Sequence, residues 1–149
     1  MIVSTKGRYA LRVMIDLAQH MEQGYIPLKE VAGRQGISEK YLEAILKLLV
    51  ENELVSGVRG KNGGYKLVRK PSDITAWDVI SVTENDFHAV ACLSPGAPLC
   101  ERAGSCATLP MWKDLNEELK TFFTRYTIEG LADGGSNPPG ARDKEDASR

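Results

Sequence analysis

The sequence predicts a mainly α-helical protein with one β-hairpin and a long helix near its C-terminus. Three observations predict this fold class. Apolar residues recur at helical spacing in three segments of the first fifty positions. Two short strand-like runs with a glycine-rich turn between them follow at residues 54–69. Beyond residue 110, apolar residues return at alternating steps of three and four, which is the seam of two helices packed side by side.

A first amphipathic helix is predicted from Thr5 to Met21. Its apolar stripe consists of Ala10, Val13, Met14, Leu17, Ala18 and Met21. Gly24 ends this helix, and Pro27 opens a shorter helix that runs to about Gln35.

The third predicted helix follows a tight turn at Gly36 and has Ser38 as its N-cap. Ile37 and Leu42 are placed to form a hydrophobic staple, which fixes the angle at which the chain enters this helix. Its buried side carries Leu42, Ile45, Leu46 and Leu49. Its outer side carries Lys40, Glu43, Ala44 and Lys47. This pair of helices is either a helix-turn-helix or an ordinary αα-hairpin with a solvated face.

The next segment favours the helix-turn-helix. Residues 54–59 and 65–69 form two strand-like runs, and residues 60–64 between them are Gly-Lys-Asn-Gly-Gly. A helix-turn-helix followed by a basic hairpin is a winged helix-turn-helix, in which the hairpin is the wing. Arg59 and Lys61 can then reach a minor groove or its phosphates. Because this loop joins two strands and lacks a Gly-Lys-Ser/Thr ending, we exclude a nucleotide-binding loop.

The distribution of charge agrees with a nucleic-acid partner. The net charge is −1, from 19 Lys and Arg against 20 Asp and Glu. Residues 1–70 hold 12 basic and 7 acidic side chains, whereas residues 71–149 hold 7 basic and 13 acidic ones. The neutral total therefore conceals a basic N-terminal half and an acidic C-terminal half.

A loop with three cysteines follows the predicted DNA-binding domain, residues 1–84. Thr75 caps a helix that runs to about Glu84, and residues 85–109 then form a loop with Cys92, Cys100 and Cys106. The odd cysteine count argues against a closed set of disulfides. The loop lacks the short cysteine spacing of a structural zinc site, so we expect a soft metal or iron–sulfur cluster, or a metal-free thiol redox switch.

The last ordered element predicted is a dimerisation helix over residues 110–132. The predicted fold is therefore a winged helix-turn-helix followed by a long C-terminal helix. The stripe of this helix consists of Trp112, Leu115, Leu119, Phe122 and Tyr126. This stripe either folds back on its own domain or pairs with a second copy of the chain, and we favour the homodimer. Residues 133–149 have no apolar pattern and are expected to be a disordered tail.

Several classes of protein are excluded or made less favourable. No apolar run is long enough to span a membrane, and the first eight residues lack a secretion signal, so we expect a cytoplasmic protein. No nucleophile and base can be paired, so we expect neither an enzyme nor a small-molecule substrate. An electron-transfer protein with the helices as scaffold is a further alternative, against which the basic wing argues.

Five segments of the chain are similar to the bacterial Rrf2 family of winged-helix transcriptional regulators. They are residues 4–11, 37–43, 54–60, 63–65 and 74–75. The similarity continues through the three cysteines to Thr127-Ile128-Glu129 and covers about residues 1–132.

This resemblance implies a homodimer that places the third helix and the wing on double-stranded operator DNA. It places Tyr41, Glu43, Arg59 and Gly60 among the DNA-contacting residues. The full candidate set is Ser38, Lys40, Tyr41, Glu43, Ala44, Lys47, Arg59, Gly60 and Lys61. A cluster-free regulator of cysteine metabolism, controlled by a partner protein or by thiol oxidation, is the alternative within the family.

The resemblance also implies that the three cysteines hold an iron–sulfur cluster, and we expect [2Fe–2S] rather than [4Fe–4S]. Family members complete the cluster with a histidine after the last cysteine or with an N-terminal aspartate, and these positions are Leu109 and Arg8 here. The fourth ligand is therefore unassigned. We rank Glu101 and His88 first, ahead of Glu84 and Asp86.

Overall fold

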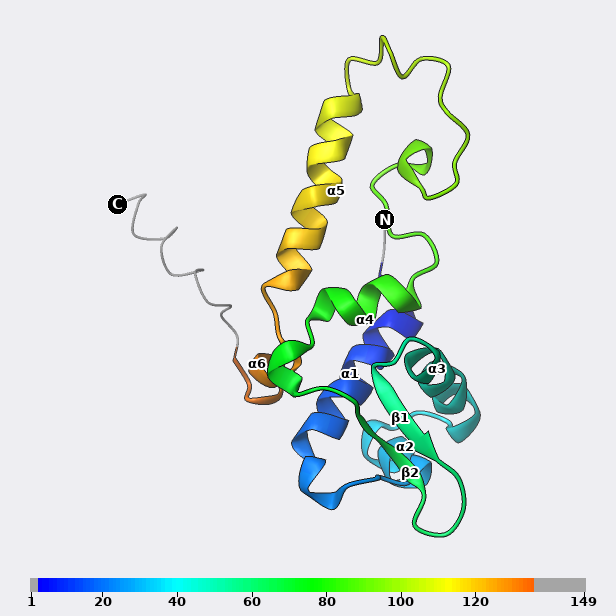
Figure 1. The fold of residues 1–149 in the computed structure, drawn as a ribbon, viewed down its shortest axis with the longest axis vertical. Coiled ribbons are helices and arrows are strands. Elements are labelled where there is room, and N and C mark those ends of the chain that lie inside the picture. Colours follow the sequence, from blue (N-terminus) through cyan, green and yellow to red (C-terminus); the bar gives the residue numbers. More distant parts are fainter. Residues whose placement is uncertain (1–2, 136–149) are drawn as a thin grey trace, which may run out of the picture.

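The computed structural model describes residues 3–135. Figure 1 shows a body of helices with a hairpin, from which a helix and a long loop project. The body contains α1 (Thr5–Gln19), α2 (Leu28–Gln35), α3 (Glu39–Glu51), β1 (Val55–Val58) and β2 (Gly64–Leu67). α4 (Ala76–Thr83) lies across this body, α5 (Leu109–Thr124) is the projecting helix, and α6 (Ile128–Ala132) returns to α1. The predicted mainly helical winged fold is confirmed.

Helix α1 is the central helix of the body. Ser4 caps it by accepting a hydrogen bond from the Gly7 amide, and the predicted stripe is buried from Ala10 to Leu17. The prediction that this helix extends to Met21 was wrong. The chain leaves helical geometry after Gln19 and forms a separate 3₁₀ turn, so Met21 is turned off the stripe and is 46% exposed.

The turn between α2 and α3 has the predicted geometry. Gly36 adopts the left-handed conformation with φ 64°, where a side chain would be strained. Ser38 accepts a hydrogen bond from the Tyr41 amide, and both members of the staple, Ile37 and Leu42, are buried. Pro27 precedes α2 and does not lie inside it. These local contacts fix the direction of α3 relative to α2.

The wing is an antiparallel hairpin that is fastened to the chain before α2. Val55 pairs with Leu67, and Val58 pairs with Gly64. Ile26 adds a third backbone partner, because its amide and carbonyl both bond to Tyr65, at 2.9 and 2.8 Å. Gly64 has φ 150°, and a Cβ atom there would lie 2.3 Å from the Ile26 carbonyl oxygen. Glycine is required at this close approach.

Helix α4 joins the winged helix to the cysteine loop. Thr75 and Asp78 form a capping box, in which each side chain accepts a hydrogen bond from the other residue's amide. Ile74 and Val79 are fully buried at its start. The loop that follows contains one short 3₁₀ turn, at Ala91–Leu93.

The prediction of one continuous helix over residues 110–132 was wrong, because the structure divides this segment into α5 and α6. The interruption has two causes. The Tyr126 carbonyl accepts the Ala76 amide at 2.8 Å, and the Ile128 amide donates to the Ile74 carbonyl at 2.8 Å. Thr127 then caps α6 by accepting the Gly130 amide at 3.0 Å. Tyr126 therefore lies beyond the end of α5.

Two further expectations concern the ends of the chain and the membrane. Most of the predicted disordered tail, residues 136–149, lies outside the described residues. Within residues 3–135 no helix combines the length and the apolar character that crossing a bilayer requires.

Candidate nucleic-acid interface and cysteine cavity

The outer face of α3 is open to solvent, as its sequence pattern predicts. Ser38, Lys40, Glu43, Ala44 and Lys47 are exposed, and Tyr41 is half-buried. The Tyr41 ring packs edge-on against Tyr9 of α1, with ring centroids 5.8 Å apart. This contact holds the first turn of α3 against the body, so the polar side chains of that turn stand on a fixed support.

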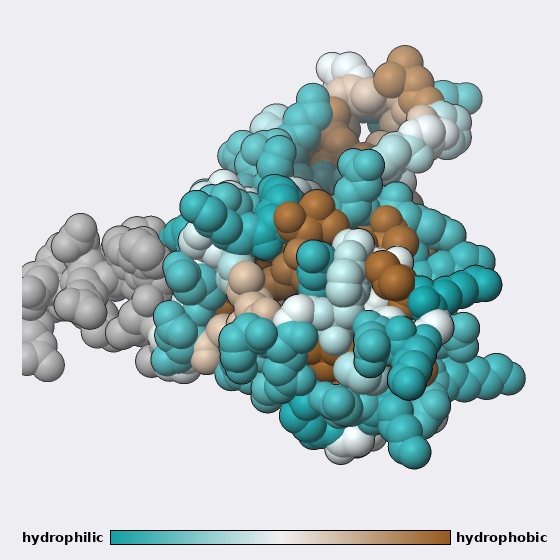
Figure 2. Space-filling view, turned by 60° about the horizontal axis from the view of Figure 1, so that its bottom comes forward, coloured by the Kyte–Doolittle hydropathy of each residue, from teal (hydrophilic) through white to brown (hydrophobic). Residues whose placement is uncertain are grey.

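A groove separates α3 from the wing. Its volume is about 390 Å³, and its charged lining comprises Glu43, Lys47, Glu51 and Arg59. Lys47 and Glu51 are 4.0 Å apart, whereas Arg59 has no acidic partner within that distance among residues 3–135. Figure 2 turns this end of the molecule forward and shows a mostly hydrophilic surface interrupted by smaller apolar patches. The groove lining therefore combines two carboxylates with two cations, of which Arg59 is the cation without an acidic partner among the described residues.

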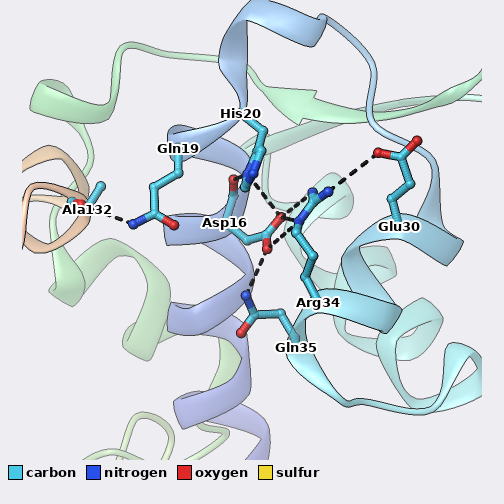
Figure 3. Close-up of polar contacts among 7 residues, drawn as sticks. All are labelled: Asp16, Gln19, His20, Glu30, Arg34, Gln35 and Ala132. Carbon is cyan, nitrogen blue, oxygen red and sulfur yellow. Dashed lines mark hydrogen bonds and ion pairs between the residues drawn. The ribbon is translucent and has the colours of Figure 1, made fainter.

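The helix-turn-helix rests on a buried ionic network that the sequence analysis missed (Figure 3). Asp16 of α1 is 1% exposed and accepts hydrogen bonds from Arg34 at 2.7 and 3.0 Å and from Gln35 at 2.8 Å. Burial raises the pKa of Asp16, but the hydrogen bonds and charge of Arg34, with Gln35 and His20, lower it by more, so the net shift is downward. A carboxylate between Val13 and Leu17 of the predicted core stripe was the signal that could have revealed this network.

The three cysteines line one cavity at the far end of α5 from the wing. This cysteine cavity has a volume of about 280 Å³. Its remaining lining is Leu93, Ala97, Pro98, Leu99, Ala103, Leu109 and Lys113. All three thiols are free. The Thr108 hydroxyl, 3.4 Å from the Cys106 sulfur, and the Thr108 amide lower the pKa of the Cys106 thiol.

The cavity brings three residues that could hold an iron–sulfur cluster around one space. Among residues 3–135, no three His, Cys, Asp or Glu side chains are arranged to hold one metal ion. Three soft thiol ligands around one largely apolar cavity fit an iron–sulfur cluster, which is wider than an ion and takes its ligands from separated positions.

None of the four candidate fourth ligands lines the cysteine cavity. The Nδ1 atom of His88 lies 3.5 Å from the side-chain amide nitrogen of Asn116. Glu84 accepts both the amide and the hydroxyl of Ser4, at 2.9 and 2.7 Å. Asp86 accepts the hydroxyl of Ser94. Glu101 is exposed and is the one of the four without a hydrogen bond among the described residues.

Comparison with known proteins decides the family. A model of the Rrf2 family, described as iron-dependent transcriptional regulators, matches residues 3–134. The chain belongs to the Rrf2 family. It is 40% identical over 131 residues to the HTH-type transcriptional regulator IscR of Klebsiella pneumoniae (strain 342), covering 88% of this chain and 79% of the relative. The corresponding Escherichia coli protein is 39% identical over 131 residues, with 88% and 80% covered.

Solved structures of Rrf2 proteins share the fold. T. potens IscR matches with a TM-score of 0.69 and 33% identity, covering 100% of this chain and 92% of that one. CymR, the global cysteine regulator of B. subtilis, matches with a TM-score of 0.68 and 33% identity, covering 89% and 97%. This Rrf2 protein is therefore a winged-helix DNA-binding transcriptional regulator and not an enzyme.

Helix α5 of this Rrf2 protein has no buried residue. Leu115 and Phe122 of the predicted stripe are 40% and 45% exposed, and the neighbouring Met111 is 53% exposed. Trp112 and Leu119 of the stripe, and Tyr126 beyond the helix, are half-buried. Residues 3–135 thus leave an apolar face of α5 partly uncovered.

One edge of the α5 stripe, where Asn116 and Phe123 lie beside Trp112 and Leu119, is fastened to the start of the cysteine loop. Phe87 packs between Trp77 of α4 and Phe123 of α5, with ring centroids 6.0 and 5.6 Å away. The Asn116 side chain accepts the Ala89 amide at 2.6 Å. A change in the loop therefore acts directly on the packing of α4 and α5. Sequence reasoning did not single out Phe87 or Asn116.

Proposed function

We propose that this Rrf2 protein is a homodimer that binds a palindromic operator and responds to an iron–sulfur cluster held by Cys92, Cys100 and Cys106. The observation that carries the proposal is the convergence of three free thiols on one largely apolar cavity, at the end of α5 remote from the wing. A protein that works on a bacterial chromosome acts in the cytoplasm, where iron and redox state vary.

The DNA contacts divide into two groups with different roles. Exposed side chains in the first turns of α3 are placed to read base edges in a major groove. The wing tip, with Arg59, Gly60 and Lys61, is placed to meet phosphates or a minor groove. The whole proposed set is Ser38, Lys40, Tyr41, Glu43, Ala44, Lys47, Arg59, Gly60 and Lys61. Most of the affinity then comes from neutralised phosphates and falls steeply with salt.

Exposure of the α5 stripe supports a dimer. Removing Trp112, Leu115, Leu119 and Phe122 from water requires a second apolar surface, and no described segment of the same chain covers them fully. A second copy supplies that surface with twofold symmetry. Two recognition helices related in this way match the two halves of a palindrome.

When bound, the cluster supplies a redox- and iron-sensitive link between separated parts of the loop. The chain's own residues connect the loop to the helices. Asn116 binds the loop to α5, and Phe87 packs between α4 and α5. Loss of order in the loop therefore alters the packing of these two helices. We propose [2Fe–2S] with three cysteine ligands and a fourth ligand that is not cysteine. Glu101 is the first candidate because it adjoins Cys100 and makes no hydrogen bond among the described residues, and His88 is the second.

The test is anaerobic purification with iron and sulfide analysis and a visible absorption spectrum. The wild-type protein should be coloured and should contain iron and sulfide. Cys92→Ala should lose both, whereas Ser105→Ala, a change elsewhere in the same loop, should keep them. Iron-free wild-type protein under these conditions refutes the cluster.

A cluster-free regulator is the second candidate, and the similarity to CymR favours it. The two candidates differ in how the operator affinity responds. Selection from a pool of random DNA duplexes defines the operator, and its affinity is then measured with and without the cluster. If the affinity changes only on thiol oxidation of iron-free protein, the cluster-free candidate is correct.

A further inference from the structure

We infer that Lys113 is the residue that tunes the cluster, by placing a positive charge at the wall of the cysteine cavity. This inference rests on the proposed function. Of the described residues, Lys113 is the one charged residue that lines the cavity. It lies one helical turn after Leu109, which also lines the cavity, so both project from the same face of α5.

The ammonium group of Lys113 is free to act on the cavity. Within residues 3–135 it forms no ion pair, although Glu117 lies one turn further along α5. The alkyl chain of the lysine can pack on the apolar lining while its charged end stays in solvent at the cavity wall. The N-terminus of α5 adds a second positive contribution, because Leu109, which also lines the cavity, begins the helix.

The electrostatic consequence follows from the charge of the ligands. Three cysteine thiolates make the loaded cavity negative, and one-electron reduction adds a further negative charge without a proton. A cation beside the cluster therefore favours the reduced state and raises the reduction potential. Much of the cavity wall is aliphatic and screens this interaction weakly. The lysine is solvent-exposed, which limits its effect.

The experiment titrates the anaerobically purified, cluster-loaded protein with dithionite as the electron donor. Lys113→Met should lower the equilibrium constant for reduction by up to about tenfold, or about 59 mV for a one-electron couple. Lys113→Arg retains the charge and should restore the wild-type potential. Lys120→Met removes an exposed lysine of the same helix that does not line the cavity, and it should leave the potential unchanged.

A second readout does not depend on the potential. Acetylation with acetic anhydride should modify Lys113 more slowly in the loaded protein than in the cluster-free protein, while Lys120 is modified at the same rate in both. Equal rates at Lys113 in the two forms contradict a charge placed beside the cluster.

Two results of the titration overturn the inference alone: a wild-type potential in Lys113→Met, or equal shifts in Lys113→Met and Lys120→Met. Wild-type protein without iron and sulfide overturns the inference together with the proposed cluster. Iron and sulfide analysis of the wild-type protein therefore separates the two kinds of failure.

Discussion

Replacing Phe122 by serine should weaken the association of two protomers by about a thousandfold. Phe122 is 45% exposed in the single chain. Since a phenylalanine buries about 150–250 Å² when fully covered, roughly 90 Å² of it remains for an interface. At about 25 cal/mol per Å², this area contributes about 2 kcal/mol per protomer. A twofold interface contains the residue twice, so the loss is about 4 kcal/mol, or about a thousandfold in the dimer dissociation constant.

Sedimentation equilibrium over a range of protein concentrations measures that constant directly. Glu117→Ser is the matched control, because Glu117 is an exposed residue on the far side of α5 from the stripe. Phe122 also contacts Phe123 and Tyr126 within the chain, with ring centroids 5.2 and 5.4 Å away, so thermal unfolding must be recorded for each variant. If the folded Phe122→Ser protein dimerises as tightly as the Glu117→Ser protein, α5 is not the dimer interface.

Three further predictions concern the body and the wing. Asp16 has a depressed pKa in the folded state, so its contribution to stability is complete above the ordinary carboxyl pKa of about 4 and is lost as the pH falls through the lower folded value. Urea unfolding between pH 7 and pH 3 should therefore show a smaller pH dependence in Asp16→Asn. Gly64→Ala should destabilise the wing by about 2–3 kcal/mol, because the new Cβ overlaps the Ile26 carbonyl oxygen, and operator affinity should fall with it. Glu43→Ala should change which bases are preferred in a duplex selection, whereas Lys61→Ala should weaken all sequences alike and reduce the salt slope by about 1.

Each of these has an outcome that contradicts it. Equal pH dependence in the wild type and Asp16→Asn means that the carboxylate does not stabilise the fold through its charge. Wild-type stability in Gly64→Ala means that the backbone contact with Ile26 is looser than the structure has it. If Glu43→Ala leaves the base preference unchanged, the proposal that α3 reads the bases is wrong.

Features defined by residues close together in the sequence were predictable. The Ser38 cap, the staple of Ile37 and Leu42 and the cap at Thr75 all follow from spacings of a few positions, and the structure has each of them. The clustering of the cysteines within fifteen residues likewise predicted a shared site.

Features that depend on distant partners were not predictable. The stripe pattern runs through Tyr126 without a break, and the break arises only because its carbonyl bonds to Ala76, fifty residues earlier. The Asp16 network joins two helices, and a pairing with Arg34 cannot be read from a single sequence. The fourth cluster ligand is undetermined for a related reason, because no spacing rule places a single carboxylate or imidazole of a long loop.

Helix α5 connects the cysteine loop to the DNA-binding body. The helix has 16 residues and is therefore about 24 Å long. Its lower end is held on the body by the backbone bonds of Tyr126 and Ile128, and its upper end carries the cysteine cavity. In the proposed dimer, a change of loop packing at the upper end tilts the helix at its base and so alters the separation of the two DNA-reading heads. Half-sites on B-DNA lie about one turn, roughly 34 Å, or a multiple of it apart. Under the proposed function, the packing of the loop therefore decides whether the spacing of the two heads matches the operator.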